Sequence, residues 1–134
     1  MQENWKTYKL ADVVQYINGG AWPASSYSDC GIPVVRVSDI KNGAIDLSAC
    51  KYLDPQFKEK FSKHFLKQND VIICTVGSHP DQQSSVVGRA GIVSKNEEGA
   101  YLNQNAVILR SSNSRILDQK WLIFFAKSRI VKPY

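Results

Sequence analysis

The chain has 134 residues, 43% of them hydrophobic, which fits a single domain that buries its own core. Its formal net charge of +5 and isoelectric point near 9.2 favour a polyanionic partner over an acidic small molecule. No apolar run approaches the roughly 20 residues that a bilayer crossing needs. We therefore expect neither a transmembrane segment nor a membrane partner.

The three cysteines, Cys30, Cys50 and Cys74, are odd in number and far apart in the sequence. They form neither a disulfide framework nor a CxxC metal knuckle. This cysteine usage predicts a reduced, cytoplasmic compartment and no bound metal.

The N-terminal part predicts a short helix over 10–17, because its apolar residues recur at a spacing closer to 3.6 than to 2. Gly19 and Gly20 end this helix, and an irregular loop follows over 21–31. Trp22 and Tyr27 are the bulky side chains of that loop. They either fold back over the core or stack on a ligand.

Residues 32–37 predict a strand, and a tight turn at Lys41-Asn42-Gly43 predicts that two strands pair around it. Arg36 lies among valines in the first strand. Its guanidinium either extends to solvent in a structural role or points into a binding groove.

Residues 54–65 predict a second helix, with Asp54 as its cap and Pro55 at its first position. Phenylalanines recur every four residues on one face, which is typical of core packing. Four lysines, Lys58, Lys60, Lys63 and Lys67, fall on the remaining surface, which is either simply solvated or contacts phosphates. We expect His64 to be a surface residue of this helix.

The strands predicted over 71–76 and 87–93 enclose a polar loop with Gly and Pro, and a third strand is predicted over 101–109. Asn103, Gln104 and Asn105 interrupt the third strand. Each carboxamide carries a donor and an acceptor in one plane, an arrangement that pairs with adenine in the major groove. The alternative is a turn that satisfies its own backbone.

A C-terminal helix is predicted over 116–130. The predicted elements together indicate an α/β (α+β) fold, in which short helices flank a mixed, mainly antiparallel twisted sheet. The sequence lacks GxSxG, GxxxxGK, HExxH and GxGxxG motifs, and Asp81 and Asp118 match a nuclease metal site only loosely. We therefore expect no cofactor and no catalysis by this chain.

Short motifs follow one another along the chain: Trp5 and Leu10, Gly19-Gly20 and Pro23, Gly31-Ile32-Pro33, Arg36, Asp39-Ile40, Asn42-Gly43-Ala44-Ile45, Asn69-Asp70-Val71-Ile72, Gly77, Gly88 to Gly91, and Asn103-Gln104-Asn105. In this order and spacing, from about Trp5 to the terminal helix, the chain resembles a target-recognition domain of the specificity (S) subunit of type I restriction-modification enzymes.

This resemblance implies an α/β domain that binds one half of a split double-stranded DNA target without catalysis. It also implies methyltransferase (M) subunits and restriction (R) subunits as partners. Subunits of this family hold two recognition domains joined by long helices, whereas this sequence has one domain over 1–134, with 116–134 near the start of a spacer. We expect a truncated chain, an amino-terminal half, or a short subunit that works as a pair or homodimer.

The resemblance and the residues together predict three groups of contacts. We expect base-edge contacts from the polar loop and the carboxamides: Ser78, His79, Gln82, Gln83, Ser84, Asn103, Gln104 and Asn105. Phosphate or guanine contacts are expected from Arg36, Lys41, Arg89 and Arg110. The alternative function is a protein-interaction module that docks a methyltransferase subunit through Trp121, Phe124 and Phe125. His79, next to Pro80, either shapes the loop or contacts a base.

Overall fold

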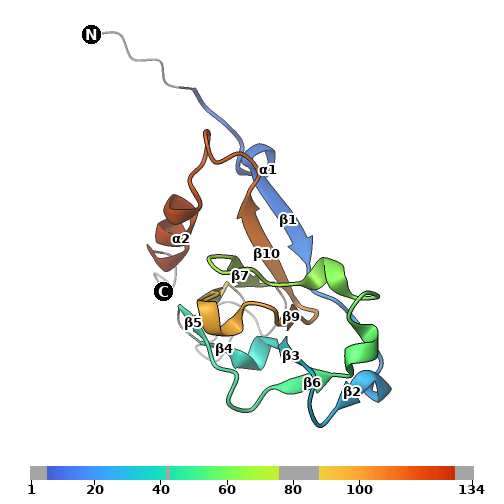
Figure 1. Cartoon of the computed structure of the whole chain (residues 1–134). Coiled ribbons are helices and arrows are strands. Elements are labelled where there is room, and N and C mark those ends of the chain that lie inside the picture. Colours follow the sequence, from blue (N-terminus) through green and yellow to red (C-terminus); the bar gives the residue numbers. More distant parts are fainter. Residues whose placement is uncertain (1–5, 42, 76–87, 129–134) are drawn as a thin grey trace, which may run out of the picture.

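The computed structural model describes residues 6–41, 43–75 and 88–128. Within these residues the strands form two four-stranded sheets and one two-stranded hairpin, which short helices surround (Figure 1). Most strand pairs are antiparallel and one is parallel. The predicted α+β class with a mainly antiparallel sheet is confirmed.

The first sheet has the strand order β1-β10-β7-β8, and all of its pairs are antiparallel. Its strands are β1 (Val14–Asn18), β7 (Val71–Cys74), β8 (Ala90–Ile92) and β10 (Ala106–Ser111). The central strands β7 and β10 are rich in β-branched residues and largely buried, whereas most of β1, at one edge of the sheet, is exposed. Strands were predicted near β7, β8 and β10.

The second sheet has the order β2-β6-β3-β9, in which β3 and β9 are parallel. Its strands are β2 (Tyr27–Ser28), β3 (Ile32–Val35), β6 (Lys51–Leu53) and β9 (Tyr101–Leu102). The separate hairpin pairs β4 (Ile40–Lys41) with β5 (Ala44–Ile45). Gly43 has a φ of 81° there, which confirms the predicted tight turn.

Successive side chains along a strand of the first sheet point to opposite faces, and each face packs into a different core. On β7, Ile72 and Cys74 pack with residues of β3, β4, β5 and β9, whereas Val71 and Ile73 face the opposite way. This second face is covered by α2 (Gln119–Ser128), which buries Leu122 there. A third, smaller core lies under the second sheet and includes Leu53 and Tyr101.

The helix predicted over 10–17 is wrong in its second half. α1 covers only Leu10–Val13, and the chain continues as β1, whose residues pair along their whole length with β10. Val14 and Ile17 are β-branched, and pairing with β10 satisfies their backbone groups. The tertiary partner therefore overrides a pattern that locally suits a helix.

The single helix predicted over 54–65 is also wrong, since this segment forms two 3-10 turns, η3 (Pro55–Phe57) and η4 (Ser62–His64). The Asp54 side chain accepts a hydrogen bond from Gln56 N at 3.0 Å, and Pro55 begins the first turn, so both start signals are confirmed. The helix does not continue because Phe61 packs on Trp22, with ring centroids 5.0 Å apart, and Phe65 forms a β-bridge with Tyr101.

His64 is buried, which corrects the predicted surface position. Trp22 folds back over the third core, and its indole N–H donates to Tyr27 Oη at 3.2 Å. The other short turns are η1 (Ala24–Ser26), η2 (Val37–Asp39) and η5 (Lys95–Glu97). The terminal helix begins three residues later than predicted, after Asp118, whose side chain accepts from Lys120 N at 2.8 Å.

Candidate nucleic-acid interface

The segment that contains the predicted recognition loop leaves and rejoins the described structure at one end of the first sheet. Thr75 N donates to Asn105 O at 2.9 Å, and Gly88 N donates to Cys74 O at 2.9 Å. The carboxamide turn and both flanks of the segment therefore meet at this end of the sheet, which we call the recognition end. The predicted contact residues Ser78, His79, Gln82, Gln83 and Ser84 lie outside the described residues.

The carboxamide turn connects β9 to β10 and contains one residue with a positive φ, Asn105 at 73°. Its three side chains differ in their surroundings. Asn103 is half-buried, and its Nδ2 donates to Gly20 O at 3.1 Å, so this amide holds the turn against the chain after β1. Gln104 and Asn105 are exposed, and neither side chain bonds another described residue. Direct base contact is therefore sterically open to Gln104 and Asn105.

The β4–β5 hairpin brings two predicted phosphate ligands to the β8 side of the first sheet. Gly43 N donates to Ala90 O at 3.0 Å, and Arg89 Nη1 donates to Ile40 O at 3.1 Å. Lys41 is exposed, and its Nζ contacts only Ser38 O, at 3.1 Å, among the described residues. The structure thus gathers Lys41, Arg89 and the carboxamide turn around the two flanks of the 76–87 segment.

Arg36 is held by the residues around it. Its Nε and Nη2 donate to the two carboxylate oxygens of Asp39 at 3.1 Å each, and Nη2 also donates to Ala49 O at 2.9 Å. The hydrogen bond to Asp39 raises the pKa of Arg36. These bonds show that Arg36 stabilises the turn before the hairpin, and its contact with DNA stays a prediction.

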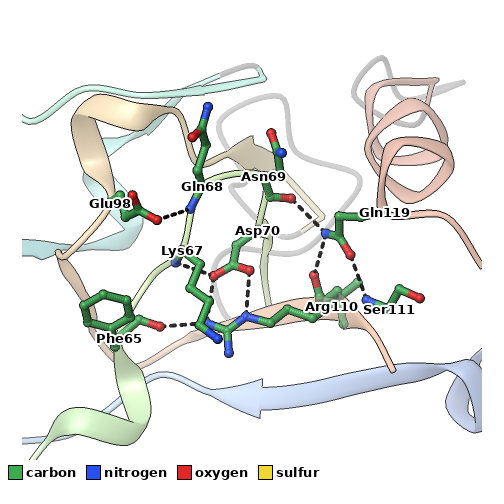
Figure 2. Close-up of polar contacts among 10 residues, drawn as sticks. Phe65, Lys67, Gln68, Asn69, Asp70, Glu98, Arg110, Ser111 and Gln119 are labelled. Atoms are coloured by element: carbon green, nitrogen blue, oxygen red, sulfur yellow. Dashed lines mark hydrogen bonds and ion pairs between the residues drawn. The ribbon is translucent and has the colours of Figure 1, made fainter. Parts of the chain in front are cut away.

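Arg110 lies away from the recognition end, because it is five residues beyond Asn105 on an extended strand, or roughly 17 Å. Its Nε donates to Asp70 Oδ1 at 2.6 Å, and its Nη2 donates to Asp70 Oδ2 and Phe65 O at 2.8 Å each (Figure 2). The Asp70 side chain is only 3% exposed. Arg110 therefore neutralises a buried carboxylate, and its predicted DNA contact is likewise untested.

The same network anchors the start of α2. Gln119 Oε1 accepts from Ser111 N at 2.7 Å, and Gln119 Nε2 donates to Asn69 O at 2.8 Å (Figure 2). Asp70 also accepts from Lys67 N at 2.8 Å. Sequence reasoning did not identify Asp70 or Gln119 as structural partners. The sequence held one local indication of a structural role, the Asn69-Asp70 pair directly before a buried strand, because Asn and Asp favour turns.

Two of the three aromatic side chains of α2, Trp121 and Phe124, are exposed, whereas Phe125 is half-buried. Trp121 is 51% exposed and Phe124 is 71% exposed, and the Trp121 ring stacks on Phe125 at 5.4 Å between centroids. On the same sheet face that α2 covers, a groove of about 380 Å³ is lined mainly by apolar residues. Its lining residues are Leu10, Ala11, Val14, Tyr16, Ile73, Thr75, Val107 and Leu109.

Two buried titratable groups have shifted pKa values. Burial lowers the pKa of His64, and the hydrogen bond that its Nδ1–H donates to Asn18 O at 2.8 Å opposes this shift only in part. Burial raises the pKa of the Cys74 thiol to about 11, which disfavours a thiolate nucleophile. Among the described residues no cluster of three His, Cys, Asp or Glu side chains could hold a metal ion.

None of the helices within the described ranges is long and apolar enough to span a bilayer.

A sequence model of the type I restriction modification DNA specificity domain matches residues 2–134. The chain therefore belongs to this family of specificity domains. It is 22% identical over 114 residues to a protein of Methanocaldococcus jannaschii that is named as the type I restriction enzyme MjaX specificity subunit. That match covers 85% of this chain and 26% of the relative.

Two solved structures share the fold. A chain from a study of complex assembly and conformational transition of the type I R-M system matches with a TM-score of 0.67 and 19% identity over 99% of this chain. The HsdS subunit from Thermoanaerobacter tengcongensis matches with a TM-score of 0.62 and 19% identity over 90% of this chain. This chain spans 29% and 26% of those two chains, and so about a quarter of the length of its relatives.

Proposed function

We propose that this chain is a non-catalytic target-recognition domain that binds one half of a bipartite double-stranded DNA sequence in the cytoplasm. In this proposal it acts for a type I restriction-modification complex, with methyltransferase subunits, restriction subunits and a second recognition domain or homodimer partner as its neighbours. Family membership supports the class of function. The observation that carries the proposal for this chain is the convergence of the carboxamide turn, Lys41, Arg89 and the flanks of 76–87 at the recognition end.

The proposal divides the contacts into two kinds. Exposed carboxamides such as Gln104 and Asn105 suit base edges, because an amide presents a donor and an acceptor in one plane. Exposed cations such as Lys41 suit phosphates, which position a protein on the duplex without reading its sequence. Four predicted contact residues already bond other residues of the chain: Arg36, Arg89, Asn103 and Arg110. To contact DNA, each would have to give up such a bond or use a donor that remains free.

Selection from a random duplex library, followed by binding titrations at two salt concentrations, tests the proposal. We expect one enriched half-site and an affinity that falls with salt. Gln83→Ala and Gln104→Ala should each cost roughly 1–3 kcal/mol on the enriched site and little on a scrambled duplex. Lys41→Gln should weaken both duplexes alike, whereas Lys95→Gln, a matched exposed lysine on η5, should change neither. Failure to enrich any sequence from the library would overturn the proposed reading of DNA.

The second candidate is a protein-interaction module, and the exposure of Trp121 and Phe124 on α2 favours it. Aromatic side chains at the centre of an interface commonly carry much of its binding energy. Phe124→Ser should then weaken binding to a purified methyltransferase subunit, while Lys120→Ser on the same helix should not. If the chain binds that subunit but no duplex at low salt, docking is its primary function.

A further inference from the structure

The lysines of the segment after β6 form a basic surface that runs from the chain after β1, at the recognition end, toward Asp70 and Arg110. Lys58, Lys60, Lys63 and Lys67 are all exposed, with Glu59 as the acidic residue among them. No carboxylate forms an ion pair with these four lysines among the described residues. We call this set the lysine surface. Within the described part of the chain, the charge of these lysines is therefore not neutralised by an ion pair.

The fold holds the lysine surface in a defined place. Phe61 packs on Trp22, His64 is buried, and Tyr101 Oη donates to Lys58 O at 2.6 Å. Lys60 Nζ lies 5.5 Å from the centroid of the Phe61 ring, a cation–π distance. These contacts tie a segment of two short turns to β9 and to the loop after β1. The lysine backbone is consequently ordered before any ligand binds.

Two hollows lie against these lysines. One, of about 370 Å³, is lined by Lys58, Lys63 and Lys67 together with Phe65, Tyr101, Arg110 and neighbouring residues of the same segment. The other, of about 380 Å³, is lined by Asn18, Gly19, Gly20, Ala21, Lys60, Phe61, Lys63 and His64. Lys63 borders both hollows. A chain of anionic groups could therefore pass from one hollow to the other along Lys63.

The second hollow connects the lysine surface to the recognition end. Gly20, which lines it, accepts the hydrogen bond from Asn103 Nδ2. In Figure 1 the lysine segment lies on the right, in green, whereas α2 and η5 lie on the left. The turn η4 in this segment packs against β1 and β9, whereas α2 packs against β7, β8 and β10, so the lysine segment and the terminal helix contact different parts of the fold.

We propose that the lysine surface binds the phosphodiester backbone of DNA that flanks the recognised half-site. This inference rests on the proposed function and extends it to residues outside the recognition loop. Lysine is a flexible point charge with three donors, which suits phosphates, and contacts to phosphates carry no sequence information. Continuity with the carboxamide turn favours a nucleic acid over an acidic peptide, which would need no neighbouring base-reading groups.

The test compares two variants with equal loss of charge. The first replaces Lys58, Lys63 and Lys67 by Gln, and leaves Lys60 because its ammonium packs on phenylalanine rings. The control replaces Lys95, Lys120 and Lys127 by Gln, three exposed residues on η5 and α2. A third variant changes Lys58, Lys63 and Lys67 to Arg, which preserves the charge. Thermal unfolding confirms that each variant folds.

Fluorescence anisotropy with a mixed-sequence 20-base-pair duplex measures affinity between 50 and 200 mM salt. Because the slope of log K against log salt is negative, three lost phosphate contacts should reduce its magnitude by about 2.7. The unaltered chain should then lose about 40-fold more affinity over this range than the Gln variant. The control variant should keep a slope close to that of the unaltered chain, and the Arg variant should recover it.

The outcomes separate this inference from the proposed function. Loss of slope in the Gln variant supports the lysine surface, whether or not the chain selects a sequence from a library. If the unaltered chain selects a sequence but the Gln variant has the same salt slope as the control variant, only the proposed role of the lysine surface is overturned. Stronger binding to poly-glutamate than to the duplex overturns the assignment of phosphates as the ligand of the lysine surface. Absence of duplex binding overturns both that assignment and the proposed function.

Discussion

The contact between Arg110 and Asp70 yields the sharpest prediction, because the same arginine was also expected to contact DNA. The Asp70 side chain is 3% exposed and accepts bonds from Arg110 Nε, Arg110 Nη2 and Lys67 N. Arg110→Leu would leave this carboxylate buried with one remaining donor. Removing one partner of a buried ion pair costs about 3–5 kcal/mol. Since Arg110 is itself 18% exposed, we expect the lower end, about 3 kcal/mol.

Urea denaturation measures this loss. With a slope of about 2 kcal/mol/M, a loss of about 3 kcal/mol lowers the unfolding midpoint by about 1.5 M. The double variant Arg110→Leu/Asp70→Asn removes both charges but keeps an acceptor for Lys67 N. It should be at least about 1 kcal/mol more stable than Arg110→Leu alone, because no uncompensated charge stays buried.

An unchanged urea midpoint for Arg110→Leu would refute this reasoning. Lost duplex affinity with an unchanged midpoint would instead support the predicted DNA contact of Arg110. The double variant distinguishes a third case: if it is as unstable as the single variant, the loss comes from the packing of the arginine stem and not from the buried charge.

Two further predictions concern Gly19, which directly follows β1, and His64 on η4. A Cβ on Gly19 would lie 1.8 Å from Asn103 O, so Gly19→Ala should cost about 2–3 kcal/mol and lower Tm by about 8–12 °C in a thermal melt, whereas Ala21→Ser at an exposed position should melt unchanged. Burial lowers the pKa of His64 below its ordinary 6.5, so the unfolded chain binds the proton first as pH falls. The His64 contribution to stability should therefore be fully present above about pH 6.5 and be lost as pH falls below that value, by at most about 1.4 kcal/mol per pH unit. His64→Gln should flatten that decline in urea titrations, and an unaltered pH profile in this variant would exclude His64 as its source.

Local chemistry predicted the parts of the fold that depend on neighbours in sequence. The glycine at position 43 marked the hairpin turn, Asp54 marked the start of a turn, and β-branched runs marked β3, β7 and β10. The interruption predicted at 103–105 within one strand over 101–109 contains Asn105 with its positive φ, but the structure divides that strand into β9 and β10, which belong to different sheets. These features need only backbone sterics and side chains a few residues away.

Distant partners decided what local patterns left ambiguous. The apolar residues over 10–17 suit a helix, but β10 offers a ladder of backbone hydrogen bonds to β1. The phenylalanines of 54–65 suit one helix face, but Trp22 and Tyr101 draw two of them in different directions. Both errors arise because burial against another segment outweighs a propensity of a few tenths of a kcal/mol per residue.

The sequence by itself determined the class of fold, the strands at its centre, and, through its ordered motifs, the family to which the chain belongs. Only the tertiary structure decided which polar side chains are available to a ligand. Asp70 and Arg110 are 40 residues apart in the chain, and Asn103 and Gly20 are 83 apart. Because burial of this kind arises only when the sheets assemble, the structure alone separates the half-buried Arg36, Asn103 and Arg110 from the exposed Lys41, Gln104 and Asn105.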